Sequence, residues 1–472
     1  MRGGVSGGPQ SAMVRLTAHP LQRVGAFALA TLVGKRHPGE LSLDDLGAAV
    51  EVMRADLEPT VTLADAKAPG GFWLGASYML WPNSAMNTTN RKKLSVAERR
   101  ERLREWRCAP APGRGIDAPC TLCGAEALGF FGKVDVPLGA SVQYLNTTAR
   151  GHDGLALCWG CLASFHALPY GCAVTGGRAT ALHSWDESFL QRTVRRQARL
   201  MRAKPQVAAG AFGSGRPYAR QVAALARLRS YDERLTAGVE LVVFTNSNKE
   251  QTLDTYGLDQ DLAEWLRRVS HQQDPGWRFL VRAHHKEKVP GLSWLARCLF
   301  ANPRGVVGTS AGYLRNLVIN TGVLPGEVPA LGALCSSYMS GVLGMDENNA
   351  KEIRRLAETI AETANGDKAE VKQFVFATRA PRELKRWLRR QAIDRTLTTS
   401  IREPFVTDRQ WELLFDSGTD SYALRELLLI RTLMEVQDRA PDWRTDDPAL
   451  RGELDDEFDS EPAETDDLPE VE

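Results

Sequence analysis

The sequence predicts an α+β multidomain protein, in which a mixed α/β N-terminal body is followed by a C-terminal helical bundle. At 472 residues, the chain is longer than the roughly 250–300 residues that a single core usually supports. Residues 238–245 form the most strand-like run, because they are rich in Val, Leu and Phe. Beyond about residue 325, nearly every segment has helical apolar spacing instead. We therefore place the body at 13–325 and the bundle at 330–440.

The first part of the body is expected to be mainly helical. Residues 21–34 and 43–53 place apolar side chains at helical spacing, and the second helix is expected to be capped by Ser42 or by Asp44 and Asp45 in its first turn. Residues 72–81 form an aromatic run, and residues 95–107 predict a charged helix. This charged helix leads into a region that is rich in cysteine.

That region contains two C-x-x-C pairs, Cys120/Cys123 and Cys158/Cys161, which are separated by 34 residues. A C-x-x-C pair on each of two turns supplies the four thiolates that tetrahedral Zn²⁺ prefers. Gly124 directly follows the first pair and suits a tight turn. The separation exceeds the usual spacing of about 15–20 residues, so we expect an insertion such as a hairpin between the pairs.

The cysteines therefore predict an inserted four-cysteine zinc ribbon over about residues 108–175. The protein fills all four coordination positions, which leaves none for a catalytic water, so the expected Zn²⁺ is structural. Chance pairing of reduced cysteines and a redox C-x-x-C are the alternatives, and two pairs this close disfavour both.

The net charge of +1 conceals a strong asymmetry along the chain. Residues 446–472 contain thirteen acidic residues and one arginine, a balance of −12, so the rest of the chain carries +13. We expect a flexible leader at 1–12 and an acidic disordered tail at 441–472. The folded part is basic, and the natural partner of a basic protein is nucleic acid.

The composition also disfavours membrane and secreted proteins. No run approaches the roughly 18 apolar residues of a membrane helix, and residues 1–12 lack the apolar core of a signal peptide. The four cysteines outside the pairs are scattered, as is typical of buried reduced thiols. We therefore expect a cytoplasmic protein without a membrane partner.

Two arginine-rich segments are candidate nucleic-acid surfaces. Residues 188–231 hold ten Arg or Lys and no acidic residue. A solvated helix face is the alternative, but ten uncompensated charges repel one another, so contact with a polyanion is favoured. A second basic helix is expected in the bundle. The candidate contacts are Arg192, Arg195, Arg196 and Arg199 in the first segment and Arg382, Arg386 and Arg389 in the second.

A polar loop after the aromatic run is a third candidate. Asparagine offers both a donor and an acceptor, which suits the reading of base edges, and neighbouring basic side chains would hold phosphates. On the residues alone, a polar surface loop is the favoured interpretation. The candidates are Asn83, Ser84, Asn87 and Asn90 for bases and Arg91, Lys92 and Lys93 for phosphates.

The sequence offers no convincing catalytic motif. Gly308–Gly312 fits a G-x-S-x-G nucleophile elbow, but this elbow needs a later histidine and the last one is His285. We expect a turn there, leading into a helix near Tyr313. His284, His285 and Glu287 could serve a nuclease, although an exposed basic loop is the favoured interpretation. We therefore expect a protein that is not an enzyme.

Several motifs, taken in order, resemble a known family. The chain resembles the CXXC–CXXC family of CRISPR-associated large subunits, found in type I-B Cascade, over about residues 20–330. Its helical end is similar in architecture to the Cascade small subunit and would also fold alone, with Met339 or Met345 as an internal start. The motifs are His19–Leu21, Trp81–Ser84, Cys120–Gly124, Leu157–Cys161 and Leu168–Gly171.

The resemblance implies a non-catalytic subunit of an RNA-guided surveillance complex in antiviral defense. Its partners would be other Cascade subunits, crRNA and target double-stranded DNA, together with a helicase–nuclease or a transposition adaptor. The asparagine loop would read the protospacer-adjacent motif (PAM), and the arginine surfaces would help to open the duplex and stabilise the R-loop. A free-standing zinc-ribbon DNA-binding regulator and a nucleic-acid-processing enzyme are the alternatives.

Overall fold

The computed structural model describes most of the chain. The expected leader, Asn90 and residues 446–472 lie outside the described residues. The described residues are 13–63, 66, 68, 70–87, 91–108, 111, 115–139, 154–175, 177–203, 217–247, 251–271, 275–398, 403–416, 420–440 and 444–445.

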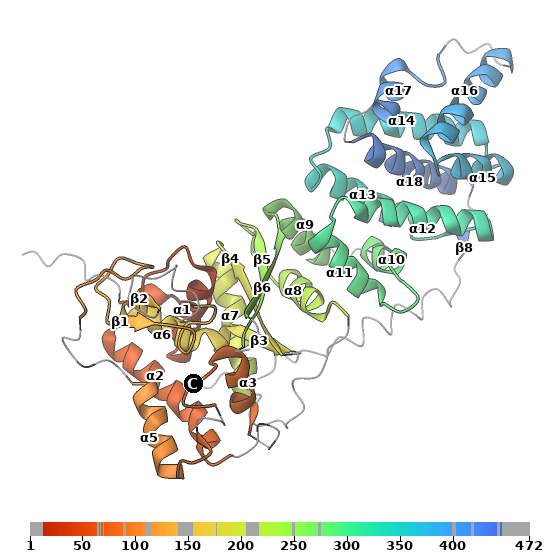
Figure 1. The fold of residues 1–472 in the computed structure, drawn as a ribbon. Helices are drawn as coiled ribbons and strands as arrows, with labels where there is room; N and C mark the ends of the chain where they lie inside the picture. Colours follow the sequence, from red (N-terminus) through yellow and green to blue (C-terminus); the bar gives the residue numbers. More distant parts are fainter. Residues whose placement is uncertain are drawn as a thin grey trace, which may run out of the picture. The chain divides into compact units, whose positions relative to one another are not determined.

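The chain divides into two compact units (Figure 1). The N-terminal unit comprises Met1–Arg216 and Leu235–Gln260, and the C-terminal unit comprises Pro217–Arg234 and Asp261–Glu472. The division therefore falls at residue 260, whereas the sequence pattern changes near residue 325. The expected mixed α/β character and the helical C-terminal region are confirmed.

The N-terminal unit contains the helices expected from the sequence. The capping box at Ser42 is present, with Asp45 as its partner. The aromatic run also forms a helix. The helices are α1 (Pro20–Leu32), α2 (Leu43–Leu57), α3 (Phe72–Leu80), α5 (Val96–Trp106), α6 (Trp159–Ala167) and α7 (Glu187–Ala203), with short 3₁₀ turns η1 (Pro38–Glu40), η2 (Glu58–Val61) and η4 (Leu168–Gly171).

An antiparallel sheet of four strands completes this unit. Its order is β3 (Cys172–Thr175), β4 (Arg178–Ser184), β5 (Val239–Asn246) and β6 (Gln251–Leu258). The strand expected at 238–245 is β5, which lies between two partners and is buried along most of its length. Helices α1, α3 and α7 all pack on β4 or β5.

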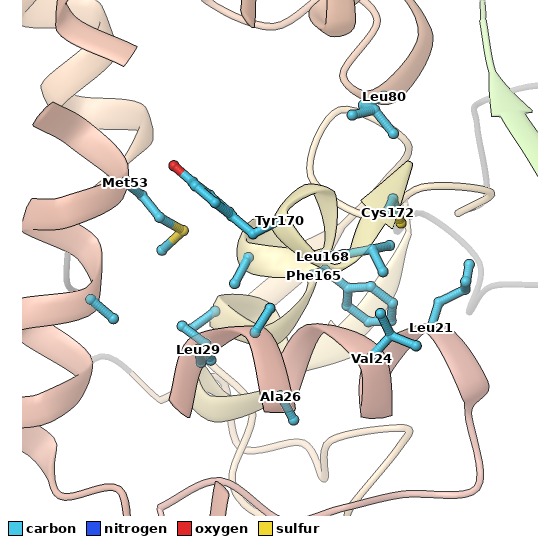
Figure 2. Packing of buried hydrophobic residues seen from close by; sticks show 14 of the residues in the cluster. Leu21, Val24, Ala26, Leu29, Met53, Leu80, Phe165, Leu168, Tyr170 and Cys172 are labelled. Atoms are coloured by element: carbon cyan, nitrogen blue, oxygen red, sulfur yellow. The ribbon is translucent and has the colours of Figure 1, made fainter. Parts of the chain in front are cut away.

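The core of the N-terminal unit is centred on the crossing of α1 and α6. A methyl group on Gly25 of α1 would overlap the Ser164 carbonyl oxygen of α6, so glycine permits this close approach. Beside it, buried Gln22 donates a hydrogen bond from Nε2 to Ser164 Oγ at 3.3 Å. Figure 2 shows apolar side chains from α1 packed against α6, η4 and β3: Leu21, Val24 and Leu29 against Phe165, Leu168, Tyr170 and Cys172.

Where the structure describes it, the C-terminal unit consists of helices and one pair of short parallel strands, β7 (Leu324–Pro325) and β8 (Arg444–Thr445). Among the helices that the structure describes, none has both the length and the apolar character of a membrane span. The helices are α8 (Ala219–Arg229), α9 (Gln260–His271), α10 (Pro275–Ala283), α11 (Gly291–Ala301), α12 (Gly305–Thr321), α13 (Val328–Gly341), α14 (Glu347–Ala364), α15 (Lys368–Ala377), α16 (Pro381–Thr398), α17 (Asp408–Phe415) and α18 (Ser421–Arg439).

Helix α18 is the centre of this unit, because it packs on α12, α13, α14 and α17. Glu426 of α18 and Arg315 of α12 form a buried ion pair at 2.9 Å. A chain that began at Met339 or Met345 would lack α12 and most or all of α13. The side of α18 that these helices cover would then be exposed, so the packing disfavours an internal start there.

The turn expected at Gly308–Gly312 is wrong, because these residues lie inside α12, which begins at Gly305. Thr309 and Ser310 donate their hydroxyl groups to the carbonyl oxygens four residues earlier, on Gly305 and Val306. A glycine lowers helix propensity by only about 1 kcal/mol, and packing of Val306, Val307 and Leu314 outweighs that cost here.

The Gly25 crossing can be tested with two glycine-to-alanine variants. Gly25→Ala should lower the free energy of unfolding by about 1–3 kcal/mol, since the methyl group meets backbone that cannot yield. Gly47→Ala in α2 is the matched control, because its methyl group would meet no neighbouring atom, and it should stabilise by about 0.5–1 kcal/mol. Urea unfolding followed by tryptophan fluorescence measures both, and equal effects would contradict a tight crossing.

Candidate metal centre and basic surfaces

The two cysteine pairs come together in the N-terminal unit. The four sulfur atoms of Cys120, Cys123, Cys158 and Cys161 all lie within 4.8 Å of one another. Zn²⁺ with four bonds of about 2.3 Å would place its ligands roughly 3.8 Å apart, so the spacing suits a single ion. All four are free thiols. The cluster could therefore hold a metal ion, and an all-sulfur set favours a soft metal over Mg²⁺ or Ca²⁺.

The first pair lies on a tight turn, as expected. The Cys120 amide donates to the Ala125 carbonyl at 2.6 Å, and the Gly124 amide donates to the Cys120 carbonyl at 2.9 Å. Gly124 has a φ angle of +75°, which glycine adopts without strain. The turn directs both thiols of this pair toward the same point.

The second pair does not lie on a second turn, so the expected ribbon is wrong in this respect. Cys158 is the N-cap of α6, and Cys161 lies in the first turn of that helix. The positive end of a helix stabilises thiolates. The packing of α6 on α1 explains why the second pair begins a helix and does not form a turn, since the whole of α6 is buried. A four-cysteine cluster built from a turn and a helix end replaces the ribbon.

Two antiparallel strands join the pairs, in agreement with the expected insertion. They are β1 (Gly129–Phe131) and β2 (Leu155–Leu157). The Thr121 amide also donates to the Ala156 carbonyl at 2.9 Å. The first turn is thereby held against the strand that leads directly into Cys158.

Mutual hydrogen bonding divides the cysteines by acidity: hydrogen bonds with Cys158 and Cys161 lower the pKa of Cys120, whereas the pKa values of Cys158 and Cys161 are raised. The hydrogen bond with Cys120, followed by burial, raises the pKa of Cys158 to about 12. Hydrogen bonds with Cys120 and Cys158 and then burial also raise the pKa of Cys161. Metal binding would therefore have to displace protons from the site, which couples metal affinity to pH.

A buried polar cluster that the sequence did not reveal lies in the same unit. Asp135, in the segment after β1, accepts hydrogen bonds from Trp106 Nε1 at 2.9 Å and from His166 Nε2 at 3.4 Å. Arg107 lies 3.9 Å from the Asp135 carboxylate and stacks on Trp106, and burial lowers its pKa to about 9. In the sequence, the one sign of this cluster is the dipeptide Trp106-Arg107, which places a cation beside a large aromatic side chain.

Asn246 at the end of β5 forms hydrogen bonds with the segment that follows β1 and so holds it against the sheet. Its amide nitrogen donates to the carbonyl oxygens of Leu80 and Lys133 at 3.0 and 2.7 Å. Its side-chain oxygen accepts from the Leu138 amide at 3.0 Å. Asn246 of β5 thus links the segment that follows β1 with the end of α3.

The asparagine loop is largely buried among its described residues. Ser84 and Asn87 are 2% and 7% exposed. Arg91 is 3% exposed and donates to the Leu63 carbonyl, and burial lowers its pKa. Asn83, Lys92 and Lys93 are exposed, and Asn83 has a φ angle of +65°. In this conformation Ser84, Asn87 and Arg91 support the fold, so we do not propose that they contact DNA.

The arginine stripe of 188–231 is divided between the two units, with residues 204–216 outside the described part. On α7 the apolar face is buried, and Arg192, Arg195 and Arg199 are exposed while Arg196 is half-buried. Arg195 and Arg199 form no ion pair with the residues that the structure describes. Arg202 is paired with Asp56 at 3.1 Å.

Helix α16 in the C-terminal unit carries five basic residues along one hollow, and Lys372 of α15 extends this group. We call these six residues the basic band: Lys372, Arg382, Lys385, Arg386, Arg389 and Arg390. One hollow of 660 Å³ is lined by the five residues of α16. A second hollow of 760 Å³ is lined by Lys372, Arg386 and Arg390. The two hollows share Arg386 and Arg390, so the band is continuous.

Few carboxylates neutralise this band, and aromatic rings lie within it. Arg386 and Arg390 approach Glu383 and Glu370 only at 3.8 and 4.0 Å. Lys385 and Arg389 lie over the Trp411 ring, at 5.9 and 5.2 Å from its centroid. Phe376, which lines the second hollow, is 55% exposed. The sequence pattern had indicated the arginines, but Lys372, Phe376 and Trp411 join them only through packing.

The alternative ligand set of a nuclease is not assembled. His284 is fully buried at the end of α10, where its Nδ1 lies 2.8 Å from the Leu280 carbonyl oxygen, so the expected exposed loop is wrong for this residue. His285 and Glu287 are exposed. Within the described part of the chain, the four cysteines form the one group of metal-ligating residues.

Comparison of the chain with protein-family models, with curated proteins and with solved structures gave no match. The function therefore has to be argued from the chain's own residues.

The metal centre predicts one Zn²⁺ per chain, measured by elemental analysis of the purified protein. Cys161→Ser should lose the ion and unfold the turn and the start of α6, because the binding energy of a structural zinc is also folding energy. Cys108→Ser is the matched control: this thiol is exposed and lies outside the cluster, so its loss should leave the zinc content unchanged. Folded wild-type protein without metal would contradict the assignment.

Buried His284 predicts a pH dependence of stability. Burial lowers its pKa from 6.5 to about 4, so below pH 6.5 the unfolded chain binds the proton more tightly. The stability that neutral His284 contributes is complete above pH 6.5 and is lost as the pH falls toward 4. At pH 5 the loss should be about 2 kcal/mol.

Two leucine variants measure this loss. The difference in unfolding free energy between wild type and His284→Leu should shrink by about 2 kcal/mol from pH 7.5 to pH 5. The same difference for His285→Leu, at the exposed neighbour, should remain constant. A constant difference for both variants would mean that His284 titrates normally in the folded chain.

Proposed function

We propose that this protein is a non-catalytic nucleic-acid-binding subunit whose zinc module is structural. The observation that carries the proposal is the basic band, a continuous cationic surface with one exposed aromatic ring, Phe376, and few carboxylates among its described neighbours. Phosphates require dispersed cations, and unstacked bases require aromatic faces, so this combination suits a single strand or an opened duplex.

The metal centre supports a structural role for the bound ion. Four cysteine ligands would complete the coordination of one Zn²⁺ and leave no position for water or substrate. The ion would hold the first turn against the start of α6. Its contribution would therefore be to the stability of the N-terminal unit.

The family resemblance gives the proposal its specific form, a large subunit of an RNA-guided Cascade complex. In that role Asn83, Lys92 and Lys93 are the exposed members of the loop that would approach the PAM. Arg195 and Arg199 on α7 would hold the backbone of the duplex, and the basic band would hold a displaced strand. A helicase–nuclease or a transposition adaptor would be recruited to the assembled complex.

A paired substitution tests the basic band. Arg386→Ala with Arg389→Ala should weaken binding of labelled single-stranded DNA for all sequences alike. It should also reduce the slope of log affinity against log salt by about 1.4, or roughly 0.7 for each lost phosphate contact. Fluorescence anisotropy over a series of salt concentrations measures both quantities.

The matched control is Arg354→Ala with Arg355→Ala on α14. Both arginines are exposed, but each is paired with a glutamate of the same helix at 3.0 and 2.7 Å, so affinity and slope should change little. Equal effects of the two pairs would contradict a specific surface.

Sequencing of RNA that copurifies with the chain separates the Cascade subunit from the free-standing regulator. A guide with constant ends supports the Cascade subunit. RNA-free protein that binds one duplex sequence supports the regulator.

A further inference from the structure

The acidic residues 446–472 and the basic band are opposite in charge and belong to the same unit. The segment carries −12 in 27 residues. The band places six cations, four of them exposed and Lys372 and Lys385 half-buried, along two adjoining hollows. Two such charge densities on one chain attract each other unless geometry keeps them apart.

The strand that precedes the segment is anchored a few residues from the glycine that adjoins Lys372. Strand β8 pairs with β7 in parallel, with Thr445 opposite Pro325, so residue 446 follows directly from this pairing. Three residues before Pro325 lies Gly322, where a methyl group would be 3.1 Å from the Lys372 amine. Lys372 lines the second hollow together with Arg386 and Arg390. The acidic segment therefore follows a strand whose partner, Pro325, is three residues along the chain from Gly322, the neighbour of Lys372.

The length of the segment is sufficient to follow the band to its other end. An unstructured chain of 27 residues has a root-mean-square span of about 30 Å, and like charges extend it further. Helix α16, with 18 residues, is about 27 Å long. The first cations are thus within easy reach, and so are Arg382 and Lys385.

Apolar side chains of the segment match apolar side chains beside the band. Leu450, Leu454 and Phe458 recur at every fourth position among the acidic residues. Phe376 and Ile393, which line the two hollows, are 55% and 59% exposed. If residues 446–472 were purely polar, these two side chains would remain in water. The three apolar side chains of the segment can pack on them instead.

We propose that residues 446–472 occupy the basic band of their own chain while no nucleic acid is bound, and that they compete with nucleic acid for it. The docking follows from charge and geometry alone. The competition rests on the proposed function. The contact is intramolecular because the segment is tethered through β8 to the unit that carries the band, which gives an effective concentration on the order of 1 mM.

Zero-length carbodiimide coupling tests the docking without nucleic acid, since it joins an amine to a carboxylate only where the two are in contact. At low salt, Lys372 and Lys385 should couple to acidic residues of 446–472, and the coupling should vanish near 1 M salt, where charges are screened within about 3 Å. Lys351 on α14, which is paired with Glu347 at 3.2 Å, should not couple to the segment.

Two variants sharpen this test. Neutralising Asp455, Asp456 and Glu457 as D455N, D456N and E457Q should lower the coupling at least severalfold, whereas replacing Ser460 with Ala should not change it. A mixture of isotopically labelled and unlabelled full-length chains distinguishes contacts within and between chains. Coupling only between chains, or only to lysines outside the band, would overturn the proposal.

Removal of residues 446–472 tests the competition. With an effective concentration of about 1 mM and a weak electrostatic contact of about 0.1 mM, the shortened chain should bind single-stranded DNA roughly tenfold more tightly at low salt. The synthetic peptide 446–472, added in trans, should reverse the gain. Unchanged affinity would overturn the competition.

The two failures can be told apart. Intramolecular coupling in a chain that binds no nucleic acid would leave the docking in place and refute the proposed function. Nucleic-acid binding at the basic band without any coupling of Lys372 or Lys385 to the segment would support the proposed function and refute the docking.

Discussion

The close crossing of α1 over α6 at Gly25 is the constraint on which the N-terminal unit depends. Helix α6 supplies Cys158 and Cys161 from its first turn, packs on α1 along its length, and continues through η4 into the first strand of the sheet. The candidate metal centre is therefore part of the main core rather than an appended module. Loss of the ion would release the start of α6, and with it the packing around Gly25.

Burial separates the cations that maintain the fold from those that remain available to a partner. Arg91 and Arg107 are almost fully buried, and Arg315 forms a buried ion pair, so each of them stabilises the chain that surrounds it. The cations of the basic band lie over aromatic rings or face solvent, and the carboxylates nearest to Arg386 and Arg390 are 3.8 and 4.0 Å away. Exposed pairs at such distances contribute little, so these side chains can exchange partners at small cost. This difference makes the band suitable for a polyanion.

The C-terminal unit begins earlier in the chain than the change to helical apolar spacing near residue 325 suggests. Helices α10 and α12 pack on one another, and each also contacts a helix beyond residue 325. Helix α18 requires both α12 and α13 to cover its apolar side. Since a helix buries its apolar face against whichever neighbour completes the core, local composition alone did not mark the boundary. The short pairing of β7 with β8 also joins two segments about 120 residues apart in sequence.

The sequence by itself determined the helices, the central strand β5 and the identity of the four cysteines, because apolar periodicity, capping residues and ligand spacing are local properties. Only the tertiary structure decided that the second pair begins a helix, that His284 and Arg91 are buried, and that Gly308–Gly312 lies inside a helix. It also brought Lys372 and Phe376 beside Arg386, and it paired the strand before the acidic segment with β7, close in sequence to the glycine that adjoins Lys372. These outcomes depend on which distant segments share a core. No local pattern records that choice, since burial is settled by the packing of whole elements.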